Sequence, residues 1–524
     1  MATKAEEVSD PGLSASVAST HPDYDENIEV WQRCRDVIDG SDAVKGKGEL
    51  YLPKLPGHDT QAYLDYKMRA MFYGAVKRTI KGMSGMVFMI PPTVENLPDD
   101  VKYLLKDATF TGTPFAGFCK QVFGEVVGMG RSGILVDMPK VGAAEQRPYM
   151  IHYSAEQILN WREERRNGRM VTTLVVLSEI YEDPDPDDLY VMAQCDQYRV
   201  LDLMTVDEIT GEPLLTPIYR MRIYRTFARA DTTVDKSGYF LYDSIIPVKN
   251  GAPLDFIPFV PVGPEENSFR IQQSPILDMV EVVLSHFRTS ADLENGRHWC
   301  GTPQPWLAGF PDKPTYQIGG DQIWTTSEPT AKAEMLEFRG TGLGALEKAL
   351  DEKEQKLAVL GMRLLETQRK GQEQPEALRL RMMGDVSTLA GIVQTVSQAL
   401  TKAVNWAVNW ALASLSGDLE VTLNKDYDEM LLTAQDIQVL TMLWQSEGIS
   451  YKTLYSNLQR GKMAREGVDS QGEFDEIQTE REEKEKLARE LNPNYDEMRA
   501  AAAIAAQRGR GDQGGDQGGD QSQE

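Results

Sequence analysis

Cysteine and histidine are both scarce in this chain. The four cysteines, Cys34, Cys119, Cys195 and Cys300, lie far apart and form no C-x-x-C pair. That spacing excludes a disulfide framework and a zinc ribbon, and it fits a reducing compartment. The five histidines show neither H-x-x-x-H nor H-E-x-x-H spacing, the patterns that place two imidazoles on one helix face. The sequence therefore predicts no metal site and no bound cofactor.

Long apolar runs are also missing. No stretch reaches the roughly 18 consecutive apolar residues that a membrane-spanning helix requires. Residues 1–10 lack the apolar centre of a signal peptide. Residues 1–24 are rich in Ser, Asp and Ala, and we expect them to be disordered. The sequence thus predicts a protein without a membrane anchor.

Positive charge is in deficit. The chain has 55 Lys and Arg against 80 Asp and Glu, which gives a net charge of −25 at pH 7. Tight binding to nucleic acid needs a basic surface, because lysine and arginine displace the counterions of the phosphates. The deficit therefore excludes a protein that wraps tightly around DNA. It is compatible with a protein through which DNA slides, since an acidic wall repels phosphates.

Catalytic signatures are sparse. Gly461-Lys462-Met463 lacks the hydroxyl residue of a Walker A loop, and G-x-S-x-G occurs nowhere. The strongest enzyme-like pattern is residues 340–345, which fit G-x-G-x-x-A and open a helix. A glycine-rich hinge is the simpler interpretation, because that helix leads into a polar loop and another helix, with no second parallel strand. A nucleotide-binding α/β enzyme remains the alternative from a different class.

At 524 residues, the chain is long enough for several domains. Its pattern predicts an α+β, mostly helical fold. Apolar residues at helical spacing predict helices over residues 25–39, 60–83, 99–106 and 114–127. Thr60 is the expected cap of the second. From Ser132 to about Pro261 the pattern favours an antiparallel sheet domain, with strands at residues 133–137, 171–177, 199–203 and 218–224.

Two long helices flank a short insert rich in Pro and Gly. The first is expected over residues 275–299, where Ser274 caps the helix and Pro275 occupies its first turn. The second, over residues 343–366, contains Gly361, which costs about 1 kcal/mol relative to alanine and would permit a kink. Strand-like runs are expected within the insert at residues 306–308, 322–325 and 335–338.

The rest of the chain is again mostly helical. A polar loop follows the second long helix, and a third long helix runs from residue 376 to about 415. Thr433 to Asp436 has the spacing of a capping box. A flexible Gly/Asp/Gln repeat ends the sequence. The other expected elements are a strand at 419–423 and helices at 436–447, 451–459 and around 480–486.

The order of helix, small β insert, helix, polar loop and long helix resembles the portal proteins of tailed bacteriophages. Two regions are also similar to one portal subfamily. In the first, the matching residues are Tyr51, Leu52, Pro53, Lys54, Leu55, Tyr63, Tyr66, Lys67, Arg69, Ala70, Phe72, Tyr73, Arg78, Thr79, Gly82, Gly85, Val87, Phe88, Pro91 and Pro92. In the second, they are residues 258–264, 274–278 and 338–342.

The resemblance implies a ring of about a dozen copies at one capsid vertex. It implies portal architecture, with a β-rich wing, a helical-hairpin stem, a small α/β clip, a long tunnel helix and a helical crown. The corresponding ranges are 1–24 for a disordered N-terminus, 25–273 for the wing, 274–299 and 343–366 for the stem helices, 300–342 for the clip, 367–376 for the tunnel loop, 377–435 for the tunnel helix and its return to the wing, 436–500 for the crown and 501–524 for a flexible tail.

A portal protein does no chemistry, so the resemblance implies a structural role in the virion. The ring would be the conduit for packaging and ejecting double-stranded DNA, and it would assemble in the host cytoplasm. Its partners would be the terminase large subunit, the head-tail adaptor, and the major capsid and scaffolding proteins. The tunnel-loop residues expected to touch DNA without reading bases are Gln368, Arg369, Lys370 and Gln372. The clip residues expected to dock the terminase and tail proteins are Trp306, Phe310, Lys313, Tyr316 and Trp324.

The apolar stripes of the two stem helices give a physical expectation of their own. We expect both stripes to be buried against neighbouring copies, because a lone hairpin cannot cover them. A third interpretation, from another class, is a non-viral adaptor protein. In it, residues 275–299 and 343–366 form an ordinary helical hairpin of a monomer or dimer.

Overall fold

The computed structural model of the chain divides into two compact units, Met1–Tyr427 and Asp428–Glu524. The described residues are 17–139, 147–166, 168–184, 190, 192–206, 210–226, 239–310, 324–337, 339–365, 375–412, 419–425, 434–446, 448–460, 463–465 and 469–491.

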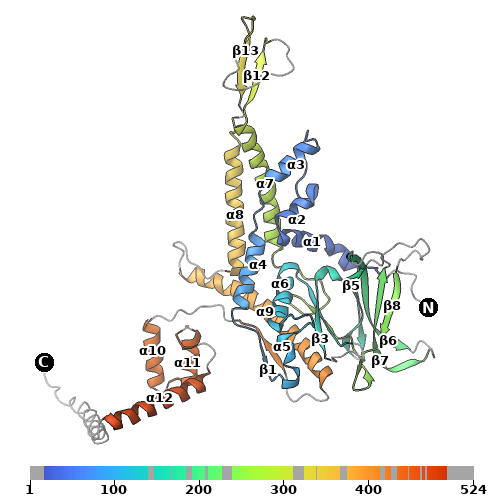
Figure 1. The fold of residues 1–524 in the computed structure, drawn as a ribbon, viewed down its shortest axis with the longest axis vertical. Helices are drawn as coiled ribbons and strands as arrows, with labels where there is room; N and C mark the ends of the chain where they lie inside the picture. Colours follow the sequence, from blue (N-terminus) through green and yellow to red (C-terminus); the bar gives the residue numbers. More distant parts are fainter. Residues whose placement is uncertain are drawn as a thin grey trace, which may run out of the picture. The chain divides into compact units, whose positions relative to one another are not determined.

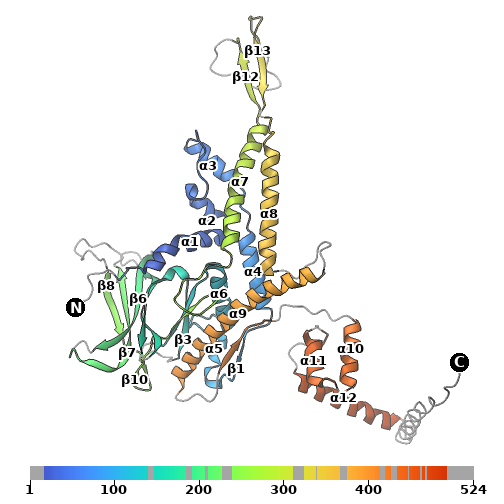
Figure 2. The same cartoon turned by 180° about the vertical axis from the view of Figure 1, so that it is seen from behind.

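The first unit begins with short helices, of which α1, α3 and α4 pack against a long helical hairpin (Figures 1 and 2). The helices are α1 (Pro22–Asp39), α2 (Ser41–Gly46), α3 (Thr60–Arg69), α4 (Ala75–Val87), α5 (Tyr103–Lys106) and α6 (Phe115–Met129). Short 3-10 turns lie at η1 (Gly48–Leu50) and η2 (Asp99–Val101). The expected helices at 25–39 and 114–127 are confirmed, and the one at 99–106 is divided between η2 and α5. The expected disorder of residues 1–24 is wrong for its last three residues, because α1 begins at Pro22 and buries Tyr24; residues 1–16 lie outside the described residues.

The expected single helix over residues 60–83 is wrong, because the chain breaks into α3 and α4. The amide of Met71 donates to the hydroxyl of Ser290 at 3.0 Å, so a tertiary contact replaces the helical hydrogen bond at that point. The cap also lies one residue earlier than expected. The Asp59 carboxylate accepts from the amide of Ala62 at 2.7 Å, as an N-cap carboxylate does.

All paired strands in the described part of the chain run antiparallel to each other. A three-stranded sheet has the order β11-β2-β3, and a five-stranded sheet has the order β4-β5-β6-β7-β8. The four expected strands from 133 to 224 lie inside β2, β5, β6 and β7. The bounds are β2 (Ser132–Asp137), β3 (Tyr149–Tyr153), β4 (Ile158–Arg166), β5 (Arg169–Pro184), β6 (Met192–Val206), β7 (Pro213–Thr226), β8 (Tyr239–Ile245) and β11 (Phe259–Val262). The remaining small strands are β1 (Thr93–Glu95) with β14 (Glu420–Thr422), β9 (Val248–Lys249) with β10 (Ala252–Pro253), and β12 (Gln304–Ala308) with β13 (Lys332–Leu336).

A continuous apolar core joins α6, the three-stranded sheet and the long helix α9 (Pro375–Ala411). Val393, Val396 and Leu400 of α9 are fully buried, and α9 packs against β2, β3 and β11. Gly130 closes α6 in the left-handed region at φ 74°. A Cβ there would lie 2.6 Å from the carbonyl oxygen of Gln272, so only glycine lets α6 end against the segment that leads into the hairpin.

The helical hairpin consists of α7 (Leu277–Gly301) and α8 (Leu343–Leu365), with the β12–β13 pair at its far end (Figure 1). Both helices lie within two residues of their expected bounds. The expected cap is wrong, because α7 begins at Leu277 with Ile276 as its N-cap, so Ser274 and Pro275 precede the helix. The second unit contains α10 (Ala434–Gln445), α11 (Tyr451–Arg460) and α12 (Ser470–Leu491). Its aromatic contacts centre on Tyr451, whose ring lies 5.3 Å from that of Phe474. Across the described residues, the helices are too short or too polar to cross a membrane.

Candidate functional site: the helical hairpin

Helix α7 buries its apolar stripe inside its own chain. Val280, Val283, Phe287 and Ala291 have no exposed surface, and α7 packs against α1, α3, α4 and α8. The ring of Phe287 meets the ring of Phe72 edge-on, with centroids 6.3 Å apart. The expectation that neighbouring copies cover this stripe is therefore wrong for α7. Periodicity showed that the stripe is apolar, but the N-terminal helices supply its cover.

Helix α8 is covered far less completely. Leu357 is buried, whereas Leu346, Leu350 and Leu360 are only half-buried. Val359 is 41% exposed. The apolar stripe of α8 is therefore only partly covered within the chain, and its burial against a neighbouring copy stays a prediction.

Polar contacts tie the two helices of the hairpin together along their length. Arg297 of α7 contacts Glu347 of α8 at 2.9 Å. Nearer the base, His286 contacts Glu354 at 3.3 Å, and burial lowers the pKa of His286 below its ordinary value. The ammonium group of Lys353 donates to the carbonyl oxygen of Ser285 at 3.1 Å. These contacts fix the register of α8 against α7, because each needs one particular pair of turns to face each other.

Gly361 lies where α8 packs closely against two other helices. Helix α8 continues through Gly361 to Leu365. A Cβ at position 361 would lie 3.2 Å from the Thr79 hydroxyl of α4 and 3.6 Å from the Met279 side chain of α7. The small residue lets three helices approach one another at the base of the hairpin.

The glycine-rich turn at residues 340–345 is a hinge between β13 and α8. Strand β13 pairs antiparallel with β12, whereas a dinucleotide site follows a strand of a parallel βαβ unit. Gly340 has φ 62°, and a Cβ there would lie 2.9 Å from the sulfur of Cys300. The glycines are therefore explained by a tight turn that packs against Cys300 of α7. The antiparallel pairing of β13 does not support the nucleotide-binding alternative.

A groove of about 650 Å³ lies between α9 and the segment that enters α7. Its lining includes the carboxylates of Glu265 and Asp278 and the amides of Gln394 and Gln398, with no lysine or arginine. Two carboxylates without a nearby cation repel phosphate groups. This groove therefore offers no nucleotide site either.

The tip of the hairpin is an exposed two-stranded sheet. Trp306 of β12 lies opposite Glu334 of β13 and is 40% exposed. Phe310 and Trp324 are half-buried. Trp324 and Thr325 belong to no strand, which corrects the expected run at 322–325 for its described half. Lys313 and Tyr316 lie outside the described residues, so three of the five expected docking residues are placed on or beside this tip.

The expected DNA-contacting loop cannot be compared with the structure. Gln368, Arg369, Lys370 and Gln372 all lie outside the described residues. Helix α8 is described to Leu365 and α9 from Pro375. The role of these four loop residues in DNA contact stays a prediction.

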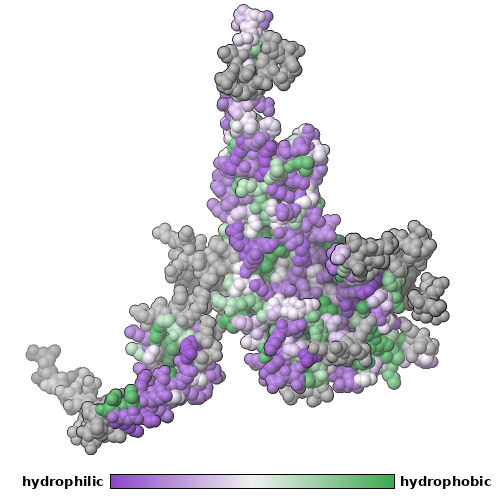
Figure 3. Space-filling view, viewed as in Figure 1, coloured by the Kyte–Doolittle hydropathy of each residue, from purple (hydrophilic) through white to green (hydrophobic). Residues whose placement is uncertain are grey.

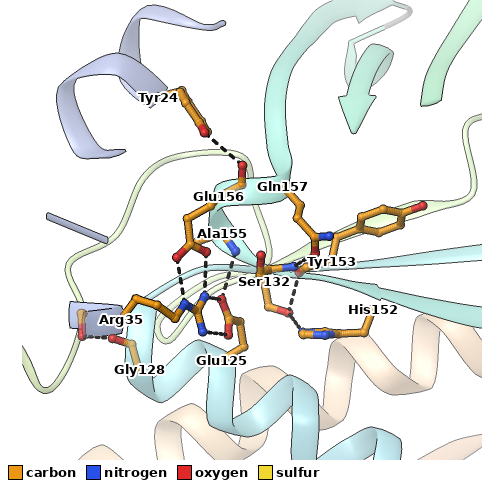
Figure 4. Close-up of polar contacts among 12 residues, drawn as sticks. Tyr24, Arg35, Glu125, Gly128, Ser132, His152, Tyr153, Ala155, Glu156 and Gln157 are labelled. Carbon is orange, nitrogen blue, oxygen red and sulfur yellow. Dashed lines mark hydrogen bonds and ion pairs between the residues drawn. The ribbon is translucent and has the colours of Figure 1, made fainter. Parts of the chain in front are cut away.

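A polar cluster below the hairpin was not apparent from the sequence (Figure 4). Arg35 of α1 contacts Glu125 of α6 at 2.6 Å and Glu156 of the turn η3 (Ala155–Gln157) at 2.6 Å. Burial raises the pKa of Glu125. Burial also opposes ionisation of Glu156, but Arg35 outweighs it and holds the pKa of Glu156 below its ordinary value. The residues are 31 to 121 positions apart in the chain, so no local motif marks them.

A serine–histidine pair lies next to that cluster. The His152 Nε2 atom lies 3.0 Å from the Ser132 hydroxyl, an arrangement also found in hydrolases. Ser132 has no exposed surface, and burial lowers the pKa of His152 to about 4. A substrate cannot reach the hydroxyl in this conformation, so we interpret the pair as a hydrogen bond between β2 and β3.

The described residues contain no group of three or more His, Cys, Asp or Glu side chains arranged to hold a metal ion. Cys34, Cys119 and Cys195 are buried free thiols, and Cys300 is a half-buried one. Burial raises the pKa of Cys34 to about 11. A thiol with so high a pKa is a poor nucleophile and a poor metal ligand at pH 7.

Comparison with known proteins gives a family of undefined function and distant structural likenesses. A family described as "Domain of unknown function (DUF4055)" matches residues 275–411, which span α7 to α9. No curated protein matches the chain. The chain is similar to one in the "Virion of native gene transfer agent (GTA) particle", with a TM-score of 0.37, 11% identity, and coverage of 79% of this chain and 98% of that chain.

Two further likenesses have the same character. The chain is similar to one in the "Neck of empty GTA particle computed with C6 symmetry", with a TM-score of 0.35, 13% identity, and coverage of 80% of this chain and 99% of that chain. It is also similar to one in the "Neck of native GTA particle computed with C12 symmetry", with a TM-score of 0.35, 10% identity, and coverage of 75% and 91%.

Proposed function

We propose that this chain is a portal protein that forms a ring at one capsid vertex. The observation that carries the proposal is the α7–α8 hairpin, with its β12–β13 tip, followed by a long helix that packs back onto a sheet. This is the order of parts that the sequence resemblance implies for stem, clip and tunnel helix. The 25 residues of α7 span about 37 Å at 1.5 Å per residue, enough to cross a capsid wall.

In this proposal each part has a mechanical role. The hairpin is the stem, residues 300–342 are the clip that binds the terminase and then the head-tail adaptor, and α9 with the preceding loop lines the DNA conduit. The partly covered stripe of α8, which includes the half-buried Leu346, Leu350 and Leu360, is the surface that a neighbouring stem covers. The net charge of −25 keeps DNA from adhering to the walls, since cations are needed to hold phosphates.

A second candidate is favoured by one observation. The complete burial of Val280, Val283 and Phe287 within the chain means that α7 needs no neighbouring copy. An adaptor protein with the same hairpin in a monomer or dimer accounts for that burial without requiring a ring. The two candidates differ in the number of copies that associate.

The proposed DNA role of the loop has a direct test. In particles packaged with the Arg369→Glu/Lys370→Glu variant, we expect intact rings but a severalfold loss of retained DNA, because the loop can no longer attract phosphates. The DNA content of purified particles is the measurement. The matched control is Arg165→Glu/Arg169→Glu, which reverses two exposed cations at the β4–β5 turn. Wild-type DNA content in the loop variant would contradict a DNA role for these residues.

A further inference from the structure

Helix α4 carries an exposed basic face in an otherwise acidic protein. Residues 66–94 contain five Lys and Arg and no Asp or Glu, although the whole chain has a net charge of −25. Lys77, Arg78 and Lys81 of this stretch are exposed on α4. None of the three forms an ion pair with another described residue. Their charge is therefore free to meet an acidic partner.

Exposed apolar side chains flank this basic face. Met68 of α3 is 70% exposed, and Met71, between α3 and α4, is 63% exposed. Met89 and Ile90 are about half-exposed after α4. Figure 3 shows hydrophobic surface over α3 beside the hairpin. Methionine and arginine are enriched where proteins bind one another. The combination indicates a protein-binding surface more than a solvated helix face.

Helix α1 presents the opposite charge. Glu26, Glu29 and Asp39 are exposed and form no ion pair with any described residue. Helices α1 and α4 pack against each other, both contact α7, and α4 also packs against α8. The acidic and basic side chains thus belong to two different helices of the same chain.

A ring of identical copies needs this kind of asymmetry. In a closed ring each copy contacts its two neighbours through two different surfaces. Copies that each carry 25 negative charges repel one another, so association requires the few basic surfaces to meet acidic ones. The basic face of α4 and the acidic face of α1 are complementary in charge and exposed in the single chain.

We propose that the α4 face of one copy, formed by Lys77, Arg78 and Lys81, binds the α1 face of the adjacent copy, formed by Glu26, Glu29 and Asp39. The partner is therefore a second copy of this chain. The proposal rests on the proposed function, because it presupposes a closed ring. It adds that the copies are joined through two different surfaces, the α4 face of one copy and the α1 face of the next.

Charge reversal tests the pairing. Variant A carries Lys77→Glu, Arg78→Glu and Lys81→Glu, and variant B carries Glu26→Lys, Glu29→Lys and Asp39→Lys. We expect each variant alone to lose most of its rings, because like charges then face each other at every contact. An equal mixture of A and B should form rings in which the two alternate, and one chain with all six substitutions should form rings alone. Mass photometry at low ionic strength measures all four samples.

Two controls separate charge pairing from a general effect of charge reversal and from misfolding. The matched control is Arg162→Glu/Arg165→Glu/Arg169→Glu, which reverses three exposed cations of the β4–β5 hairpin and should leave rings intact. Circular dichroism checks that A and B remain folded. Rings of variant A at the wild-type level would overturn the inference and leave the proposed function standing.

Three other outcomes would also overturn it. If A loses its rings and neither the mixture nor the six-substitution chain restores them, the two faces do not bind each other. If A keeps its rings but loses affinity for double-stranded DNA, the α4 face binds nucleic acid. Absence of rings from the wild-type protein would overturn the proposed function, and this inference with it.

Discussion

Replacement of Arg199 by alanine is expected to lower the free energy of unfolding by about 3–5 kcal/mol. Arg199 of β6 contacts Asp137 at 2.9 Å and Glu179 at 2.8 Å. All three side chains are largely buried. Without the guanidinium, two carboxylates remain in a site that excludes water, with no cation to offset the cost of burying them.

The pKa directions in this cluster agree with that view. Burial raises the pKa of Asp137 even though Arg199 opposes the rise. Burial acts on Glu179 in the same way, but there the attraction of Arg199 outweighs it and lowers the pKa of Glu179. Loss of Arg199 should therefore raise the pKa of both carboxyl groups and make stability fall at pH 7.

Denaturant unfolding followed by circular dichroism measures the effect. The matched control is Arg166→Ala, which removes a more exposed arginine that contacts Glu164 at 2.8 Å. Such a surface pair contributes about 0–1 kcal/mol. Equal losses in the two variants would show that the Arg199 cluster is not a buried network.

Replacement of Phe287 by alanine is expected to cost about 3–5 kcal/mol, because it empties a ring-sized volume in a packed core. Phe287 has no exposed surface and lies between the hairpin and the N-terminal helices. The loss should not depend on protein concentration, since its neighbours belong to the same chain.

Thermal unfolding at two protein concentrations is the measurement for Phe287. Val359→Ala is the matched control, because Val359 lies on α8 and is 41% exposed. We expect less than about 1 kcal/mol from the control in the single chain. A concentration-dependent loss for Phe287→Ala would mean that another copy, and not α1, α3 and α4, covers α7.

The sequence located the hairpin well because its ends carry strong local signals. Pro275 and the Pro-rich break after Thr302 bound α7, and the glycines before Leu343 bound the start of α8. The helix expected over 60–83 failed for the opposite reason. Its break depends on the contact between Met71 and Ser290, residues 219 positions apart, which no local pattern reveals.

The cover of an apolar stripe is likewise a tertiary property. Spacing alone showed that Val280, Val283 and Phe287 share one face, but it could not distinguish cover by α1, α3 and α4 from cover by a neighbouring copy. The Arg35 and Arg199 clusters lie beyond sequence inspection too, since acidic residues are frequent throughout this chain.

The position of the insert was predictable. Trp306, Phe310 and Trp324 lie on or beside the tip of the hairpin, and their role in docking stays a prediction. The basic face of α4 could have been found, because the absence of Asp and Glu from residues 66–94 is visible in the sequence. The roles of Arg369 and Lys370 rest on the resemblance and stay predictions.

The mass of the purified chain in solution tests the central claim most directly. Light scattering or mass photometry distinguishes one or two 58.7 kDa chains from a closed ring. The account predicts a single species of about twelve copies with a central opening visible by electron microscopy. A monomer or dimer at every concentration tested would contradict it and would favour the adaptor interpretation of the same hairpin.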